Sequence, residues 1–134
     1  MRDITQKSTG FLIDELITTR FRVESNPTPD NIQRMRLLDA AVRLRLNGRE
    51  DDIFLQVTKL QLVSRECWNA QEIVMKEQDI TYSPYMNDNY FQLKRLAESA
   101  IKAQKTNALR NKLIREIDTV LGESDTSVLG KTYS

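Results

Sequence analysis

The stretch "ESNPTPD", Glu24 to Asp30, stands between two segments whose apolar residues recur at helical spacing. Pro27 and Pro29 cannot both lie inside one helix, because proline lacks a backbone N–H and clashes with the preceding turn. Thr28 belongs to the residue types preferred as N-caps, and proline suits the first helical position that follows. The stretch therefore predicts the end of one helix and the start of the next.

Apolar stripes predict a helix on each side of this stretch. The first is expected over residues 9–24, with the stripe Leu12, Ile13, Leu16, Ile17 and Val23. Its opposite, polar face is expected to hold Asp14, Glu15, Thr18 and Arg22. The second is expected over residues 29–47, with the stripe Ile32, Met35, Leu38, Val42 and Leu46. Asn47 and Gly48 mark its end, because glycine accepts the left-handed backbone of a helix cap.

Two longer helices are predicted in the remaining chain. The third is expected over residues 51–78, capped by Asp51 or Asp52, with the stripe Ile53, Phe54, Val57, Leu60, Ser64, Cys67, Trp68, Gln71, Val74 and Met75. The fourth is expected over residues 88–121, from a cap at Asp88 or Asn89, with the stripes Leu93, Leu96, Ala97, Ala100, Ile101 and Leu109, Leu113, Ile117, Val120. The phase slips over residues 102–108, so the continuity of this helix stays open. We predict an all-α, antiparallel four-helix bundle-like single domain over residues 1–134, with a short polar tail at 122–134.

The composition excludes several kinds of chemistry. The 134 residues include no histidine and one cysteine, so histidine-dependent catalysis and a zinc site lack their ligands. No two acidic residues lie three or four apart, which is the spacing of carboxylate pairs on one helix face, and the four glycines are isolated. We therefore predict no enzyme, no metal and no cofactor. No apolar run approaches the roughly 20 residues of a membrane span, and a single cysteine fits a reducing cytoplasm.

The net charge of +1 hides an uneven distribution of charge. Seven bases and one acid lie between Lys94 and Arg115, whereas eight acids and three bases lie between Glu50 and Asp88. An acidic and a basic helix that compensate each other explain this pattern, and so does an anionic partner. One alternative function is the binding of a small anionic ligand such as a nucleotide, by the arginines Arg34, Arg36, Arg43 and Arg45 with Tyr82 or Trp68 stacked on a base. Another is nucleic-acid binding through the basic helices.

The segment "ITYSPYMNDNYF", Ile80 to Phe91, holds three of the four tyrosines. Tyrosine is enriched at protein interfaces, so we expect Tyr82, Tyr85 and Tyr90 to contact another chain or a ligand. The alternative is that they cover the end of their own bundle. Ser64 and Gln71 interrupt the third apolar stripe, and they indicate either a hydrogen bond across the bundle or a polar pocket with Trp68 as a wall. At about 1.5 Å per residue the two long helices exceed a compact domain, unless the fourth helix breaks. The sequence predicts a non-enzymatic binding or assembly protein that forms a homo-oligomer.

Three stretches carry a resemblance to a known family. They are "GFLIDELITTRFRVE" (10–24), "CWNAQE" (67–72) and "LRNKLIREIDTVLGES" (109–124). They resemble a small bacterial protein family of unknown function in its opening helix, its tryptophan–acid segment and its basic closing helix. The matching residues are Leu12, Asp14, Leu16, Trp68, Glu72, Arg115, Glu116, Ile117 and Leu121. The chain departs from the pattern at Gln71, where a second acid is expected. The resemblance implies an all-helical fold and no known activity.

Overall fold

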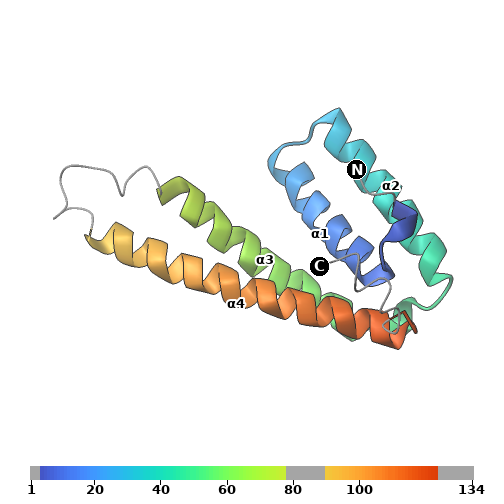
Figure 1. Ribbon diagram of the computed structural model, residues 1–134. Helices are drawn as coiled ribbons and strands as arrows, with labels where there is room; N and C mark the ends of the chain where they lie inside the picture. Colours follow the sequence, from blue (N-terminus) through green and yellow to red (C-terminus); the bar gives the residue numbers. More distant parts are fainter. Residues whose placement is uncertain (1–3, 78–89, 124–134) are drawn as a thin grey trace. The chain divides into compact units, whose positions relative to one another are not determined.

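The computed structural model describes residues 4–77 and 90–123, and in these residues the fold is all-α, as the sequence predicts (Figure 1). Four α-helices follow one another: α1 (Thr9–Ser25), α2 (Pro29–Leu46), α3 (Phe54–Glu77) and α4 (Tyr90–Val120). Short 3-10 helices, η1 (Ile4–Gln6) and η2 (Glu50–Ile53), precede α1 and α3. In the described ranges, every helix is too short or too polar to cross a bilayer.

The chain divides into two compact units. The first unit comprises residues 1–61 and 111–134, and the second comprises residues 62–110. Both α3 and α4 therefore contribute one part to each unit. We describe each unit by itself.

In the first unit, α1 and α2 form a helical hairpin whose turn follows the sequence prediction. The backbone N–H of Asn31 donates to Thr28 Oγ1 at 3.1 Å, so Thr28 is the N-cap of α2. Asn47 adopts the left-handed conformation at φ 46° and Gly48 has φ 88°, which ends α2 as expected. At the other end of the hairpin, the N–H of Phe11 donates to Ser8 Oγ at 3.2 Å and caps α1.

Helix α1 is buried on more than one face. Its predicted stripe residues Leu12, Ile13, Leu16 and Ile17 lie in the core with Leu38 and Val42 of α2. Asp14, which the sequence placed on a polar face, is also buried, and this prediction was wrong. A helix with a single packed face would leave Asp14 in water, but other parts of the first unit cover α1 on several sides.

The start of α3 differs from the prediction. Asp51 and Asp52 do not cap the helix, because they lie inside η2, and α3 begins at Phe54. The 3-10 helix positions Ile53 in the core at 1% exposure. Phe54 was expected in the apolar stripe, but 70% of its surface is exposed.

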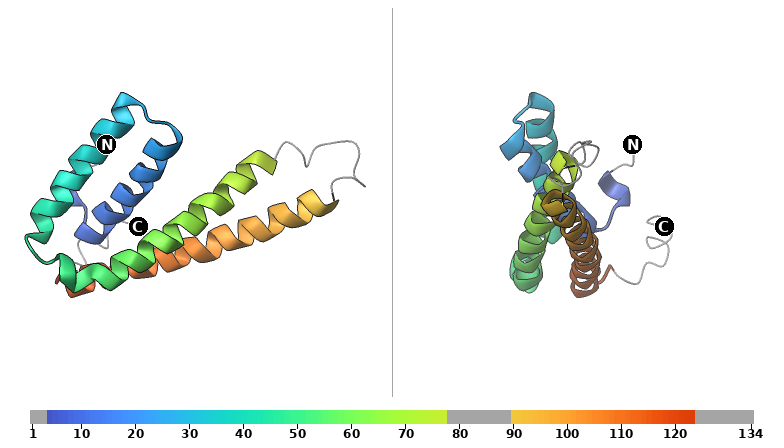
Figure 2. Two further views of the ribbon diagram at one scale, coloured as in Figure 1. Left: turned by 180° about the vertical axis from the view of Figure 1, so that it is seen from behind. Right: turned by 90° about the vertical axis from the view of Figure 1, so that its left-hand side faces the viewer.

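The second unit is an antiparallel hairpin of two helices, the later part of α3 and the earlier part of α4, which run side by side in both views of Figure 2. Helix α4 is continuous across residues 102–108, which settles the question left open by the sequence. The buried residues between the two helices are small. With the half-buried Ala103 of α4 they form what we call the small-residue seam: Ser64, Cys67 and Ala70 of α3 with Ser99, Ala103 and Thr106 of α4.

The small-residue seam corrects the predicted stripes of both long helices. On α4, Ala97, Ala100 and Ile101 are exposed, although the sequence assigned them to the core. On α3, Gln71 and Met75 are exposed as well. Two series of residues at three- and four-residue spacing coexist on α4, and the series with the smaller side chains faces α3, because small side chains allow helix axes to approach closely. Leu109, near the end of the second unit, is exposed; further along α4, in the first unit, Leu113 and Ile117 are buried as predicted, whereas Val120 is exposed.

Candidate functional site

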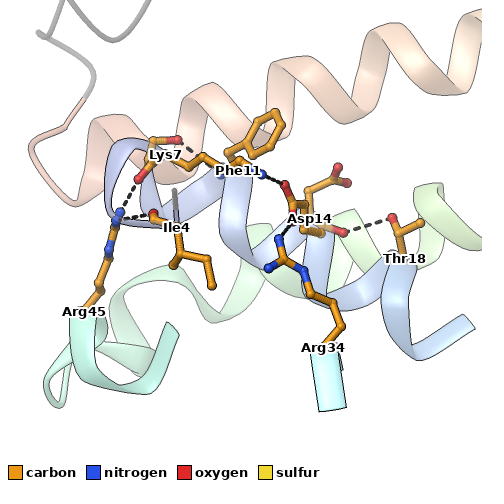
Figure 3. A network of polar contacts seen from close by, with 9 residues as sticks. Ile4, Lys7, Phe11, Asp14, Thr18, Arg34 and Arg45 are labelled. Carbon is orange, nitrogen blue, oxygen red and sulfur yellow. Dashed lines mark hydrogen bonds and ion pairs between the residues drawn. The ribbon is translucent and has the colours of Figure 1, made fainter. Parts of the chain in front are cut away.

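The arginines of α2 are engaged in contacts within the first unit. Arg34 Nη2 lies 3.0 Å from Glu15 Oε2, and Arg43 Nε lies 3.0 Å from Asp39 Oδ2. Arg45 donates to the backbone oxygens of Ile4, at 2.8 Å, and of Lys7, and Figure 3 shows its side chain directed at both residues. Arg34 and Arg45 thus fasten α2 to α1 and to the segment before it, whereas Arg43 pairs within α2.

Arg36 differs from the other three arginines. It is exposed on α2, where it borders a shallow depression together with Pro29, Ile32 and Leu37. The four arginines do not converge on one pocket, since Arg34, Arg43 and Arg45 reach three different partners. A planar guanidinium fork that is already paired loses those bonds when it turns to a phosphate.

The N-terminus of α1 is held by two carboxylates from the end of α4 and the residues just after it. The N–H of Gly10 donates to Asp118 Oδ1 at 2.8 Å. The N–H and the hydroxyl of Thr9 donate to Glu123 at 2.9 and 2.6 Å. A helix N-terminus attracts negative charge, because its first N–H groups lack partners and the helix dipole is positive there. The negative charge at the N-terminus of α1 therefore comes from the chain itself, from the carboxylates of Asp118 and Glu123.

Asp118 is a buried carboxyl group in this cluster. Burial raises the pKa of its carboxyl group above the ordinary value of aspartate, and the charge of Glu123 adds to that effect. Hydrogen bonds from the Ser8 side chain and the Gly10 amide oppose it, as does the charge of Arg45. The sequence analysis missed this cluster, because a residue separation of 108 between Gly10 and Asp118 carries no local signal.

The predicted tyrosine surface is described only at its end. Tyr82 and Tyr85 lie outside the described residues, so the contact predicted for them remains untested. Tyr90 begins α4 and is 63% exposed, and it contacts the ring of Phe91 edge-on, with 5.4 Å between the ring centroids. Phe91 is 78% exposed. Two large aromatic side chains therefore lie in water at this end of α4.

The residues predicted to line a polar pocket around Trp68 differ in their exposure. Trp68 is half-buried and donates its Nε1–H to Glu72 Oε1 at 2.5 Å. Gln71 is exposed, whereas Ser64 lies in the small-residue seam and its hydroxyl has no partner among the described residues. The pocket stays a prediction. In residues 4–77 and 90–123, no group of three acidic or cysteine side chains is arranged to hold a metal ion.

One face of α4 carries several of the exposed apolar residues that are described in the second unit. We call it the outer face, and it comprises Tyr90, Leu93, Ala97, Ala100 and Ile101. Tyr90, Leu93, Ala97 and Ala100 follow one another at intervals of three and four, and Ile101 lies four residues after Ala97, so these side chains lie on one side of the helix. Leu93 is half-buried, while Ile101 is 53% exposed. The outer face is distinct from the small-residue seam that contacts α3.

Comparison with known proteins identified no match among family models, curated proteins or solved structures. The resemblance noted in the sequence therefore remains an expectation, and arguments about function rest on the residues of this chain.

Proposed function

We propose that the protein is a non-enzymatic assembly protein that forms a homo-oligomer through the outer face of α4. The observation that carries the proposal is the exposure of Tyr90 and Ile101 on the outer face, in a unit whose described residues form two helices. Aromatic side chains bury roughly 150–250 Å² each when they are covered, so this surface is large for a small unit. An exposed apolar patch of this kind is typical of a protein–protein contact.

The packing of α3 against α4 in the second unit supports the proposal that a partner chain binds there. Serine, alanine, threonine and cysteine in the small-residue seam bury little apolar area, so the two helices gain little hydrophobic stabilisation from each other. A helix normally buries an apolar stripe against another element. In the second unit, Tyr90 and Ile101 of α4 instead lie exposed on the outer face.

A second copy of the chain is the partner that fits this surface best. Two hairpins that bring their outer faces together pack α4 of one copy against α4 of the other, so the exposed apolar side chains of both become buried. The contact is closed by a two-fold axis, so each copy covers the other and no apolar face remains open. Lys94 borders the outer face, and its long aliphatic stem can lie along the apolar surface while its ammonium group stays in water.

The assembly is tested by replacing Ile101 with glutamate. A charge in the centre of a buried apolar interface loses its hydration, so Ile101→Glu is expected to weaken association at least ten-fold. Sedimentation equilibrium over a range of protein concentrations measures the effect. Circular dichroism should show unchanged helical content, because Ile101 is 53% exposed within the single chain.

Leu44→Glu is the matched control. Leu44 is 81% exposed and lies on α2 in the first unit, so the same gain of charge occurs away from the outer face. The control is expected to associate like the unmodified protein. A monodisperse monomer at millimolar concentration of the unmodified chain would overturn the proposal. Equal weakening by both substitutions would overturn the assignment to the outer face.

A further inference from the structure

The first unit contains an apolar groove between α1, α2 and the start of α3. Its volume is about 210 Å³, and its walls include Leu16 and Ile17 of α1, Val42 and Leu46 of α2, and Ile53 and Val57. Most of these wall residues are core residues with less than a tenth of their surface exposed. The groove involves none of the residues of the outer face of α4, so it represents a separate feature of the molecule.

Water is a poor occupant of such a groove. A water molecule in a cavity needs two to four polar partners, and apolar walls do not supply them. An apolar group that displaces poorly held water gains free energy. A cavity of about 150 Å³ lined by aliphatic side chains accepts benzene, so a somewhat larger groove accommodates one ring with a short chain attached.

The two ends of the groove carry different charges. Arg20 and Asp39 lie at one end, whereas Glu50 lies beyond Leu46, at the end of α2 that is remote from Asp39. Along α1 the wall extends from Ile13 to Arg20, which is about 10 Å at a rise of 1.5 Å per residue. A ligand with an apolar body and one charged end fits this polarity.

Arg20 is able to exchange its partner. Its Nη2 lies 3.5 Å from Asp39 Oδ1, at the long limit of a hydrogen bond, while Arg43 holds the other oxygen of Asp39 at 3.0 Å. If Arg20 turned away, Asp39 would keep Arg43 as its counter-ion. The Arg20 guanidinium can therefore offer its planar fork to a carboxylate without leaving an unpaired charge behind.

We propose that this groove binds a small amphipathic carboxylate, with an apolar body of about one ring against Leu16, Val42 and Leu46 and its carboxylate paired with Arg20. The apolar walls provide most of the affinity, and the guanidinium selects the charged end. Arg20 is the residue that distinguishes a carboxylate from a neutral molecule of the same shape.

Three probes separate these contributions, with binding followed by ¹H–¹⁵N NMR titration. They are 3-phenylpropanoate, its neutral amide 3-phenylpropanamide, and propanoate, which lacks the ring. The first is expected to bind saturably and about ten-fold more tightly than the amide, with shifts at residues of the groove. Propanoate is expected to give no saturable shift. The Ile101→Glu variant should bind in the same way, so failure of the assembly proposal leaves this test intact.

Substitutions locate the site. Arg20→Met keeps an unbranched stem and removes the charge, and it is expected to reduce the affinity for 3-phenylpropanoate to that of the amide. Arg22→Met is the matched control, because Arg22 is exposed on α1 and does not line the groove. Val42→Phe fills the groove and should abolish binding of both aromatic probes, and Val57→Phe replaces it if the first variant does not fold.

Several results would overturn the proposal. They are the absence of saturable shifts with all three probes, an unchanged affinity in Arg20→Met, and unchanged binding in the filled variants. Binding of an apolar peptide helix in the groove, with none of the small carboxylate, would also refute it.

Discussion

Gly10 lies where the backbone of α1 closely approaches the backbone of α4. A Cβ atom at this position would lie 2.6 Å from the backbone oxygen of Ile114 and 2.7 Å from Asp118 Oδ1. Contacts under 3.0 Å require one of the atoms to move, and the backbone of α4 has little freedom to do so. The first turn of α1 is also where Asp118 accepts the Gly10 amide, so displacement would break that hydrogen bond as well.

We predict that Gly10→Ala destabilises the protein. Alanine favours a helix over glycine by about 1 kcal/mol, but overpacking costs about 1–3 kcal/mol and loss of the bond to a buried carboxylate adds to it. The net effect should be a loss of about 2 kcal/mol in the free energy of unfolding, measured by urea denaturation.

Gly48→Ala serves as the comparison. Gly48 has φ 88° and open space around its Cα, so alanine there meets only the strain of the left-handed backbone, about 1 kcal/mol. Amide exchange at Thr9 and Gly10 should accelerate in Gly10→Ala and not in Gly48→Ala. A Gly10→Ala protein as stable as the unmodified one would show that α1 and α4 can move apart freely.

Asp118 makes the stability of the first unit depend on pH. Because burial raises its folded-state pKa above the unfolded value, the folded protein binds this proton more tightly. The contribution of Asp118 to stability therefore falls as pH rises from the ordinary aspartate value, about 3.9, through the raised value. Asp118→Asn removes this titration and keeps an oxygen that can accept the Gly10 N–H.

The measurement is the free energy of unfolding of both proteins between pH 3.5 and 7. The unmodified protein is expected to lose stability relative to Asp118→Asn as pH increases, and an NMR titration of the Asp118 carboxyl carbon should show a raised midpoint. A constant difference between the two proteins, or one of opposite slope, would contradict the burial argument.

At the scale of elements, local chemistry allowed accurate predictions where one residue determines the backbone. Thr28, Pro29 and Asn47 fixed the bounds of α2 to within one residue, because capping depends on neighbours in the chain. The start of α3 was missed, since Asp51 and Asp52 are good capping residues but the chain forms a 3-10 helix there. A short 3-10 segment leaves no periodic signal of its own.

The faces of the long helices were harder to predict than their existence. Helical spacing shows that residues share a face, but it does not show which face meets a neighbour. On α4 the larger apolar residues were taken as core, whereas Ser99, Ala103 and Thr106 face α3. The arginines of α2 and the cluster of Gly10 with Asp118 pose the same difficulty. The partners of Arg34 and Arg45 on α2, and that of Gly10, lie 19 to 108 residues away, and a single sequence contains no information about such pairs.

At the scale of the whole molecule, the two units differ in how they bury apolar side chains. The first unit encloses large residues, among them Leu12, Leu38 and Ile117, within one chain. The second unit buries small ones, and Tyr90 and Ile101 stay exposed on the outer face of α4. If assembly covers that face, the stability of the second unit alone depends on protein concentration, because a partner that binds only the folded hairpin stabilises it by mass action.

Hydrogen exchange provides the test of this difference. Regions that open independently exchange according to their own local stability. For a dimer whose opened hairpins separate, the opened fraction falls with the square root of concentration, so a hundred-fold increase should slow exchange at Cys67 and Ala103 about ten-fold. Exchange at Leu12 and Leu38 should not change, and Ile101→Glu should remove the dependence. The idea that assembly stabilises the hairpin fails if Cys67 and Leu12 respond equally, or if Cys67 does not respond in a protein that sediments as a dimer.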